Sequence, residues 1–207
     1  MERYGYNKMS AVLGPIHYWL FNKIKIQDIL VEAVVSYGTE KYGSDIMDGI
    51  EKFGEVETES LENIIDGTNI HGWLQERVSI VENRLAFAVT AVLGKESIDN
   101  LEEIFFCLGS KVVEVPEQTD ARAVYRLLND SLLDGMPCDH ANSIVEEDDN
   151  SITYKGNVCV HEEYWNGVGT DVSVYYTLRK ALIKGMLENT NVSLQEIDEV
   201  TNQLVTK

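Results

Sequence analysis

The chain has 207 residues, enough for one ordinary domain or two small ones, and its hydrophobic content of 44% is sufficient for a packed core. Seventeen basic and thirty-five acidic side chains give a net charge of −18, a balance that disfavours nucleic acid as a partner. No apolar run approaches the roughly 18 residues of a membrane span, and the first residues lack the order of a secretory signal. Three cysteines are typical of a reducing compartment. We therefore expect an acidic cytoplasmic protein without a membrane segment.

Two segments of the N-terminal half resemble each other at an offset of 54 residues. Residues 16–28 and 70–82 share the pattern Ile-His-x-Trp-Leu, which places His17 and His71 at equivalent positions. In both segments apolar residues recur every three or four positions, which predicts an amphipathic helix. Glycines then interrupt each pattern before a second apolar segment, at 45–53 in the first copy. The sequence predicts two copies of a helical hairpin, residues 14–54 and 68–108, packed together in a pseudo-symmetric bundle.

The two equivalent histidines have two interpretations. In the simpler one, His17 and His71 each lie in the first turn of a helix and hydrogen-bond a neighbouring loop. In the other, pseudo-symmetry brings both rings to a shared site that binds a metal ion, a haem or an anionic ligand, assisted by first-turn backbone donors. The Glu-x-x-His spacing of di-iron bundles does not accompany them.

The second half mixes helical and strand patterns. Residues 119–135 and 170–187 have helical periodicity, and a capping-box spacing at Ser193 predicts a last helix over 193–205. Residues 138–161 contain a polar turn cluster between β-branched and aromatic residues, which predicts a long β-hairpin. Residues 111–115 are the candidate for a third strand.

These elements define the expected fold class, which is α+β. A duplicated helical region, residues 1–110, is followed by residues 111–207, a small antiparallel sheet flanked by helices, and we expect the two to form one compact unit.

The predicted hairpin brings a group of metal-binding residue types together. If the turn is centred on 149–150, Cys138 lies opposite His161 and His140 lies opposite Cys159. Side chains alternate between the faces of a strand, so all four would lie on one face. A bulge at the glycine of 156 would shift this register and break the group.

Two thiolates and two neutral imidazoles suit tetrahedral zinc, and they also suit iron or copper. The acidic residues around the hairpin would favour a bound cation. Two other interpretations stay open: the cysteines act as small apolar residues beside surface histidines, or Cys159 is a reactive thiol with His140 as its base. The aromatic residues Tyr164 and Trp165 follow closely and belong either to the core or to the wall of a small-molecule pocket.

Taken together, the patterns predict a cytoplasmic protein that binds a metal ion or a small ligand. Cys138, His140, Cys159 and His161 are the candidate metal ligands, and His17, His71, Tyr164 and Trp165 are the candidate ligand-binding residues. If water replaced one metal ligand, the site could be catalytic. The alternative is a regulatory protein that uses its acidic surface and helical repeats to bind a partner or to form a homodimer.

Overall fold

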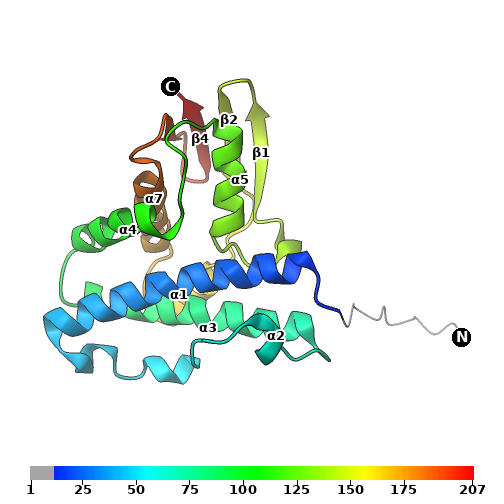
Figure 1. Ribbon diagram of the computed structural model, residues 1–207. Helices are drawn as coiled ribbons and strands as arrows, with labels where there is room; N and C mark the ends of the chain where they lie inside the picture. Colours follow the sequence, from blue (N-terminus) through cyan, green and yellow to red (C-terminus); the bar gives the residue numbers. More distant parts are fainter. Residues whose placement is uncertain (1–11) are drawn as a thin grey trace, which may run out of the picture.

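The computed structural model describes residues 12–207, which fold into a helical part and a four-stranded antiparallel sheet (Figure 1). This arrangement confirms the α+β prediction. The helices are α1 (Pro15–Tyr42), α2 (Leu61–Ile64), α3 (Ile70–Leu93), α4 (Asp99–Val112), α5 (Ala121–Ser131), α6 (Glu162–Gly167) and α7 (Ser173–Leu187), with short 3-10 helices η1 (Ser44–Met47), η2 (Ile50–Phe53) and η3 (Pro137–Asp139). The strands are β1 (Asn142–Glu147), β2 (Ser151–Gly156), β3 (Val192–Glu196) and β4 (Thr201–Thr206).

The two long helices α1 and α3 lie side by side and run in the same direction (Figure 1). His17 and His71 are in contact near their starts, and Lys41 pairs with Glu96 near their ends. Each helix buries an apolar stripe, as the periodicity predicts. The buried apolar side chains of the two helices include Leu20, Ile24, Val31, Val34, Leu74, Val78, Leu85 and Val89.

The second element of each predicted copy differs from expectation. Over 45–53, where the spacing predicts a helix, the chain forms the two 3-10 turns η1 and η2, because glycines with positive φ interrupt it at Gly43, Gly49 and Gly54. In the second copy a helix does form, but α4 packs mainly against α7 and only to a smaller extent against α1. The likeness of the two copies is thus confined to their first helices, α1 and α3.

The contact between α4 and α7 is unusually close because both helices have a glycine at the crossing. A Cβ atom added to Gly185 would overlap the backbone carbonyl of Phe106, and one added to Gly109 would overlap the backbone of α7. Glycine therefore lets the two backbones touch. This contact positions α7, the helix that carries several residues of the site described below.

The sheet has the strand order β1-β2-β4-β3, and all neighbouring strands are antiparallel. The last helix expected over 193–205 is therefore wrong, since this segment forms β3 and β4. Asp198 accepts hydrogen bonds from the backbone N–H groups of Val200 and Thr201, which makes the tight turn between the two strands. The strand expected over 111–115 is also absent from the described chain, because α4 continues to Val112 and a loop follows.

The hairpin of β1 and β2 is shorter than expected, covering 142–156 instead of 138–161. Near the turn its register agrees with the prediction, with Glu147 opposite Ile152. The pairing then shifts by one residue at Val145, so that Ile144 lies opposite Tyr154. This bulge leaves Val145 57% exposed, whereas a turn centred on 149–150 without a bulge would pair Val145 with the buried Tyr154.

One face of the sheet is covered by helices, and the ring of Tyr154 packs against Tyr125 of α5. Buried side chains from α1 to β4 belong to a single hydrophobic cluster that spans both predicted regions. Among residues 12–207, no helix is long and apolar enough to cross a membrane.

Candidate functional site

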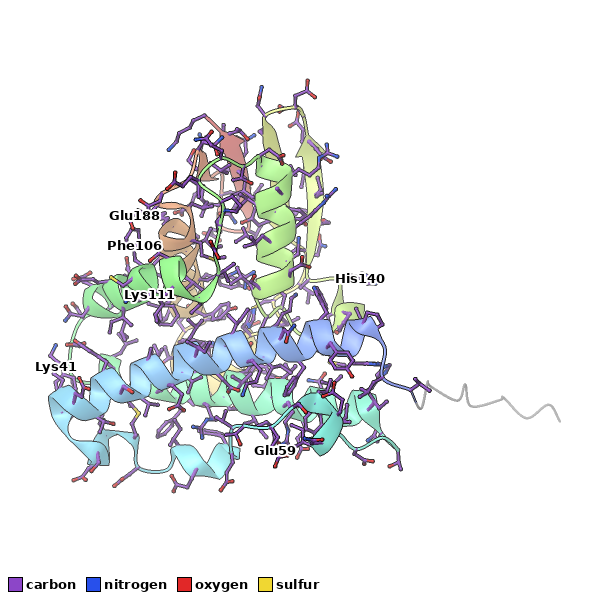
Figure 2. The ribbon with its side chains drawn as sticks, viewed as in Figure 1. Lys41, Glu59, Phe106, Lys111, His140 and Glu188 are labelled. Carbon is purple, nitrogen blue, oxygen red and sulfur yellow. The ribbon has the colours of Figure 1, made fainter. Side chains whose placement is uncertain are left out.

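The four predicted metal ligands do not come together as the long hairpin required. Cys138 belongs to η3, and His140 follows it with a positive φ of 50°. Cys159 lies in the loop after β2. All three are exposed, whereas His161 is only 1% exposed. His140 is labelled in Figure 2, in the segment between α5 and β1.

The physical reason is that the strand pairing ends at 142 and 156, before any of the four residues is reached. The predicted pairs across the strands, Cys138 with His161 and His140 with Cys159, are therefore wrong. Within the described part of the chain, no group of three or more His, Cys, Asp or Glu side chains is arranged to hold a metal ion.

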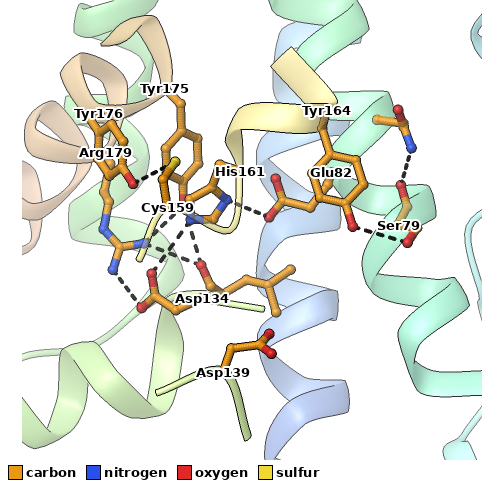
Figure 3. A network of polar contacts seen from close by, with 12 residues as sticks. Ser79, Glu82, Asp134, Asp139, Cys159, His161, Tyr164, Tyr175, Tyr176 and Arg179 are labelled. Atoms are coloured by element: carbon orange, nitrogen blue, oxygen red, sulfur yellow. Dashed lines mark hydrogen bonds and ion pairs between the residues drawn. The ribbon is translucent and has the colours of Figure 1, made fainter. Parts of the chain in front are cut away.

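His161 instead forms the centre of a buried ionic network (Figure 3). Its Nδ1 atom lies 3.1 Å from Oε1 of Glu82 on α3, and its Nε2 atom lies 3.7 Å from Oδ1 of Asp134 in the segment after α5. The ring stacks on Tyr175 of α7, with 3.9 Å between centroids. His161 thus joins the helical bundle to α7 and to the segment that precedes the sheet.

The network continues from Asp134 to α7. Arg179 donates hydrogen bonds from Nη2 to Oδ2 of Asp134 at 2.9 Å and from Nη1 to the hydroxyl of Tyr175 at 3.0 Å. Burial opposes ionisation of Asp134, but Arg179 and His161 hold the pKa of its carboxyl below the ordinary value. Two cations and two carboxylates therefore balance in the interior, as buried charges require.

His161 is protonated in this environment. Burial alone would lower the pKa of His161, but the carboxylates of Glu82 and Asp134 outweigh burial and raise the pKa to about 9. Its imidazolium ring donates from Nδ1 to Glu82. A ring held in this state between two carboxylates is a poor general base.

This raised pKa predicts how stability depends on pH. The folded state binds the proton of His161 more tightly than the unfolded state, so the stabilisation is complete below pH 6.5 and is lost as the pH rises through about 9. The contribution at neutral pH is about 2–3 kcal/mol. Urea unfolding at pH 7 and pH 10 should show a loss of this size for the native chain and a clearly smaller one for His161→Gln. Equal losses in both proteins would contradict the assignment.

His17 and His71 do lie together, with 5.5 Å between ring centroids. Nδ1 of His17 accepts a hydrogen bond from the backbone N–H of Gly14 at 2.9 Å, so its neutral ring carries the proton on Nε2. Burial and the neighbouring His71 lower the pKa of His17, which keeps the ring neutral. In this tautomer neither nitrogen of His17 offers a free lone pair, which favours a capping role over metal binding.

Tyr164 and Trp165, the predicted pocket walls, lie in the core. Trp165 is fully buried, and the hydroxyl of Tyr164 is 3.2 Å from that of Ser79 on α3. Neither residue lines the cavity between the sheet and α7.

That cavity, of about 300 Å³, lies between the sheet, the loop 157–161 and α7, directly beside the ionic network. At its wall the hydroxyl of Tyr176 donates a hydrogen bond to Sγ of Cys159 at 3.3 Å (Figure 3). Valines 158 and 200 line it while remaining about half exposed, at 49% and 55%. The cavity wall also includes Tyr154, His161, Arg179 and Asn202.

The sequence indicated only part of this site. The sequence pattern predicted Cys159 and His161 as metal ligands. It did not identify four other residues of the site, which are Glu82, Asp134, Arg179 and Asn202. One usable indication existed for Glu82, which interrupts the apolar stripe of α3 between Val81 and Leu85. A carboxylate at such a position is buried, and a buried carboxylate needs a cation.

Comparison with known proteins adds no further constraint, because no family model, curated protein or solved structure matches the chain. The fold and the geometry of the cavity therefore carry the functional argument alone.

Proposed function

We propose that the protein binds a small molecule in the cavity between the sheet and α7. The observation that carries the proposal is that three features occur in one place. They are a cavity of about 300 Å³, an apolar rim formed by the half-exposed Val158 and Val200, and a polar floor formed by Asp134, His161 and Arg179. Ligand pockets in proteins combine apolar walls with a few fixed polar groups and with titratable residues whose pKa is shifted. This cavity has all three features.

The floor of the cavity is rigid because it is built from the buried network. Asp134 and Arg179 hold each other, and His161 is fixed from the opposite side by Glu82. Fixed groups lose little conformational entropy when a ligand binds, which favours affinity. A binding role has more support than a metal-dependent one, since no group of three or more His, Cys, Asp or Glu side chains among residues 12–207 is arranged to hold a metal ion.

A nucleophilic role for Cys159 has less support. Its nearest described polar partner is the phenol of Tyr176, which donates to the sulfur. The proposed base His140 lies outside the residues that line the cavity. A thiol becomes a strong nucleophile when a base takes its proton, and the nearby His161 is already protonated. We therefore propose binding, with no covalent step.

The test uses the full chain and a panel of aromatic fragments of about ten heavy atoms, a size suited to a small pocket. Binding is measured by saturation-transfer NMR for the native protein, for Val200→Trp and for Val145→Trp. Val200 lines the cavity and Val145 does not, although both valines are similarly exposed, at 55% and 57%.

We expect fragments to bind the native protein and Val145→Trp equally, and to bind Val200→Trp at least about tenfold more weakly, because the indole occupies the cavity mouth. Equal binding by the two tryptophan variants would place the fragments elsewhere and refute the proposal. A panel without any binder to the native protein would refute it as well.

A further inference from the structure

The basic side chains at the cavity wall are each already paired with a carboxylate. Arg179 is held by Asp134, and Lys180 is 2.7 Å from Glu196. His161 is held by Glu82. An anionic ligand would have to displace one of these carboxylates, which would leave a buried charge without a partner at a cost of several kcal/mol.

Two neutral groups at the cavity wall have no hydrogen-bond partner in the described part of the chain. Oδ1 of Asn202 is buried and makes no hydrogen bond in the described part of the chain. Tyr154 also lines the cavity, and its hydroxyl has no hydrogen-bond partner within residues 12–207. Burial raises the pKa of Tyr154 to about 12, so the hydroxyl keeps its proton and can donate.

These two neutral groups are neighbours. Tyr154 on β2 is directly paired with Asn202 on β4, and side chains of opposed residues lie on the same face with Cβ atoms about 5 Å apart. The pair therefore offers one acceptor, the carboxamide oxygen, and one donor, the phenol. The buried carboxamide oxygen of Asn202 lacks a partner, which costs free energy, so a ligand that donates a hydrogen bond to it gains that amount on binding.

We infer that the ligand is an uncharged molecule with an amide or lactam edge on an aromatic or apolar body. Its N–H donates to Asn202 and its carbonyl accepts from Tyr154, while the body lies against the valines of the rim and the ring of Tyr176. This inference rests on the proposed function, since it names the ligand class of the same cavity.

Charged ligands fit less well. Glu162 and Glu199 line the cavity without ion pairs in the described chain and repel an anion. A cation would meet the positively charged side chains of His161, Arg179 and Lys180, which also line the cavity. An uncharged ligand avoids both penalties and keeps every existing ion pair.

The experiment compares three probes of similar size: benzamide, benzoate and benzylamine, which are neutral, anionic and cationic at pH 7. Each is titrated into the full native chain, and dissociation constants come from backbone amide shifts in ¹H–¹⁵N spectra. We expect benzamide to bind at least about tenfold more tightly than either charged probe. Benzoate or benzylamine binding as tightly as benzamide would overturn the inference.

Two variants test the contacts. Asn202→Leu and Tyr154→Phe should each weaken benzamide binding about fivefold, because each removes one hydrogen bond. Gln203→Leu is the control, since the adjacent side chain points to the other face of β4 and contacts Thr153. Asn202→Leu should also melt at the same temperature as the native chain or higher, since an unpaired buried atom is removed. Unchanged benzamide affinity in a folded Asn202→Leu would overturn the assignment.

Failure of the inference and failure of the proposed function give different results. If a charged probe binds best and loses affinity in Val200→Trp, the cavity is a ligand site and only the ligand class is wrong. If the three probes bind with the same affinity to Val200→Trp and Val145→Trp, both the ligand class and the cavity are refuted.

Discussion

Replacing Glu82 with leucine is expected to lower the free energy of unfolding by about 3–5 kcal/mol, because it leaves the buried imidazolium of His161 without its closest counter-charge. Leucine is similar in size, so loss of charge and not of volume dominates the effect. Urea unfolding followed by circular dichroism measures the change. Glu76→Leu on the same helix is the control and should change stability by less than about 0.5 kcal/mol, since Glu76 is largely exposed.

The double variant Glu82→Leu/His161→Leu separates pairing from other effects. When both charged partners become apolar, no lone charge remains in the interior, so the double variant should be more stable than the sum of the two single losses predicts. Strictly additive losses would mean that His161 and Glu82 do not interact, which would contradict the network in Figure 3.

The second large effect is expected at the crossing of α4 and α7. A methyl group at residue 185 would overlap the backbone carbonyl of Phe106, and backbone cannot move aside as a flexible side chain can. Gly185→Ala should therefore cost about 3 kcal/mol or more, which for a chain of this size corresponds to a fall in melting temperature of roughly 6–12 °C. Thermal unfolding followed by circular dichroism tests this.

Gly167→Ala is the matched control for this change. Gly167 ends α6, has no heavy atom within 4 Å of an added Cβ and lacks a positive φ, so its replacement should leave the melting temperature nearly unchanged. Equal melting temperatures for Gly185→Ala and Gly167→Ala would show that the two helices are not in close contact.

The helical part of the fold was predictable because its pattern is local. Periodic apolar residues predicted α1 and α3, and one of the two interpretations of His17 and His71 placed their rings together, as they are in the structure. The direction of α4 was not predictable. It depends on Gly109 meeting Gly185, which are 76 positions apart, and no local pattern encodes such a contact.

The C-terminal sheet shows how local patterns mislead. Ser193 and Glu196 have the spacing of a capping box, but the hydroxyl of Ser193 lies 3.5 Å from the carbonyl of Val205 on the neighbouring strand. β3 needs β4 as a partner, and that pairing outweighs the local helical preference. A bulge at Val145 likewise cannot be located from alternation alone, because one extra residue changes the face of everything beyond it.

The candidate site was predictable in composition but not in geometry. The sequence pattern predicted Cys159 and His161 as metal ligands, whereas in the structure their partners come from α7, from the segment after α5 and from α3. The repeat held one further indication. Asp28 is the equivalent of Glu82, and both carboxylates are buried, so acidic residues at this position of the repeat face the interior. Only the packing shows which cation each one meets.

The most direct test of the account is the location of bound benzamide on the ¹⁵N-labelled full chain. If the cavity between the sheet and α7 is the ligand site, the largest amide shifts will occur at Tyr154, Tyr176 and Asn202, and the amides of His17 and His71 will not move. Largest shifts at the paired histidines, or at any surface away from the cavity, would contradict the account.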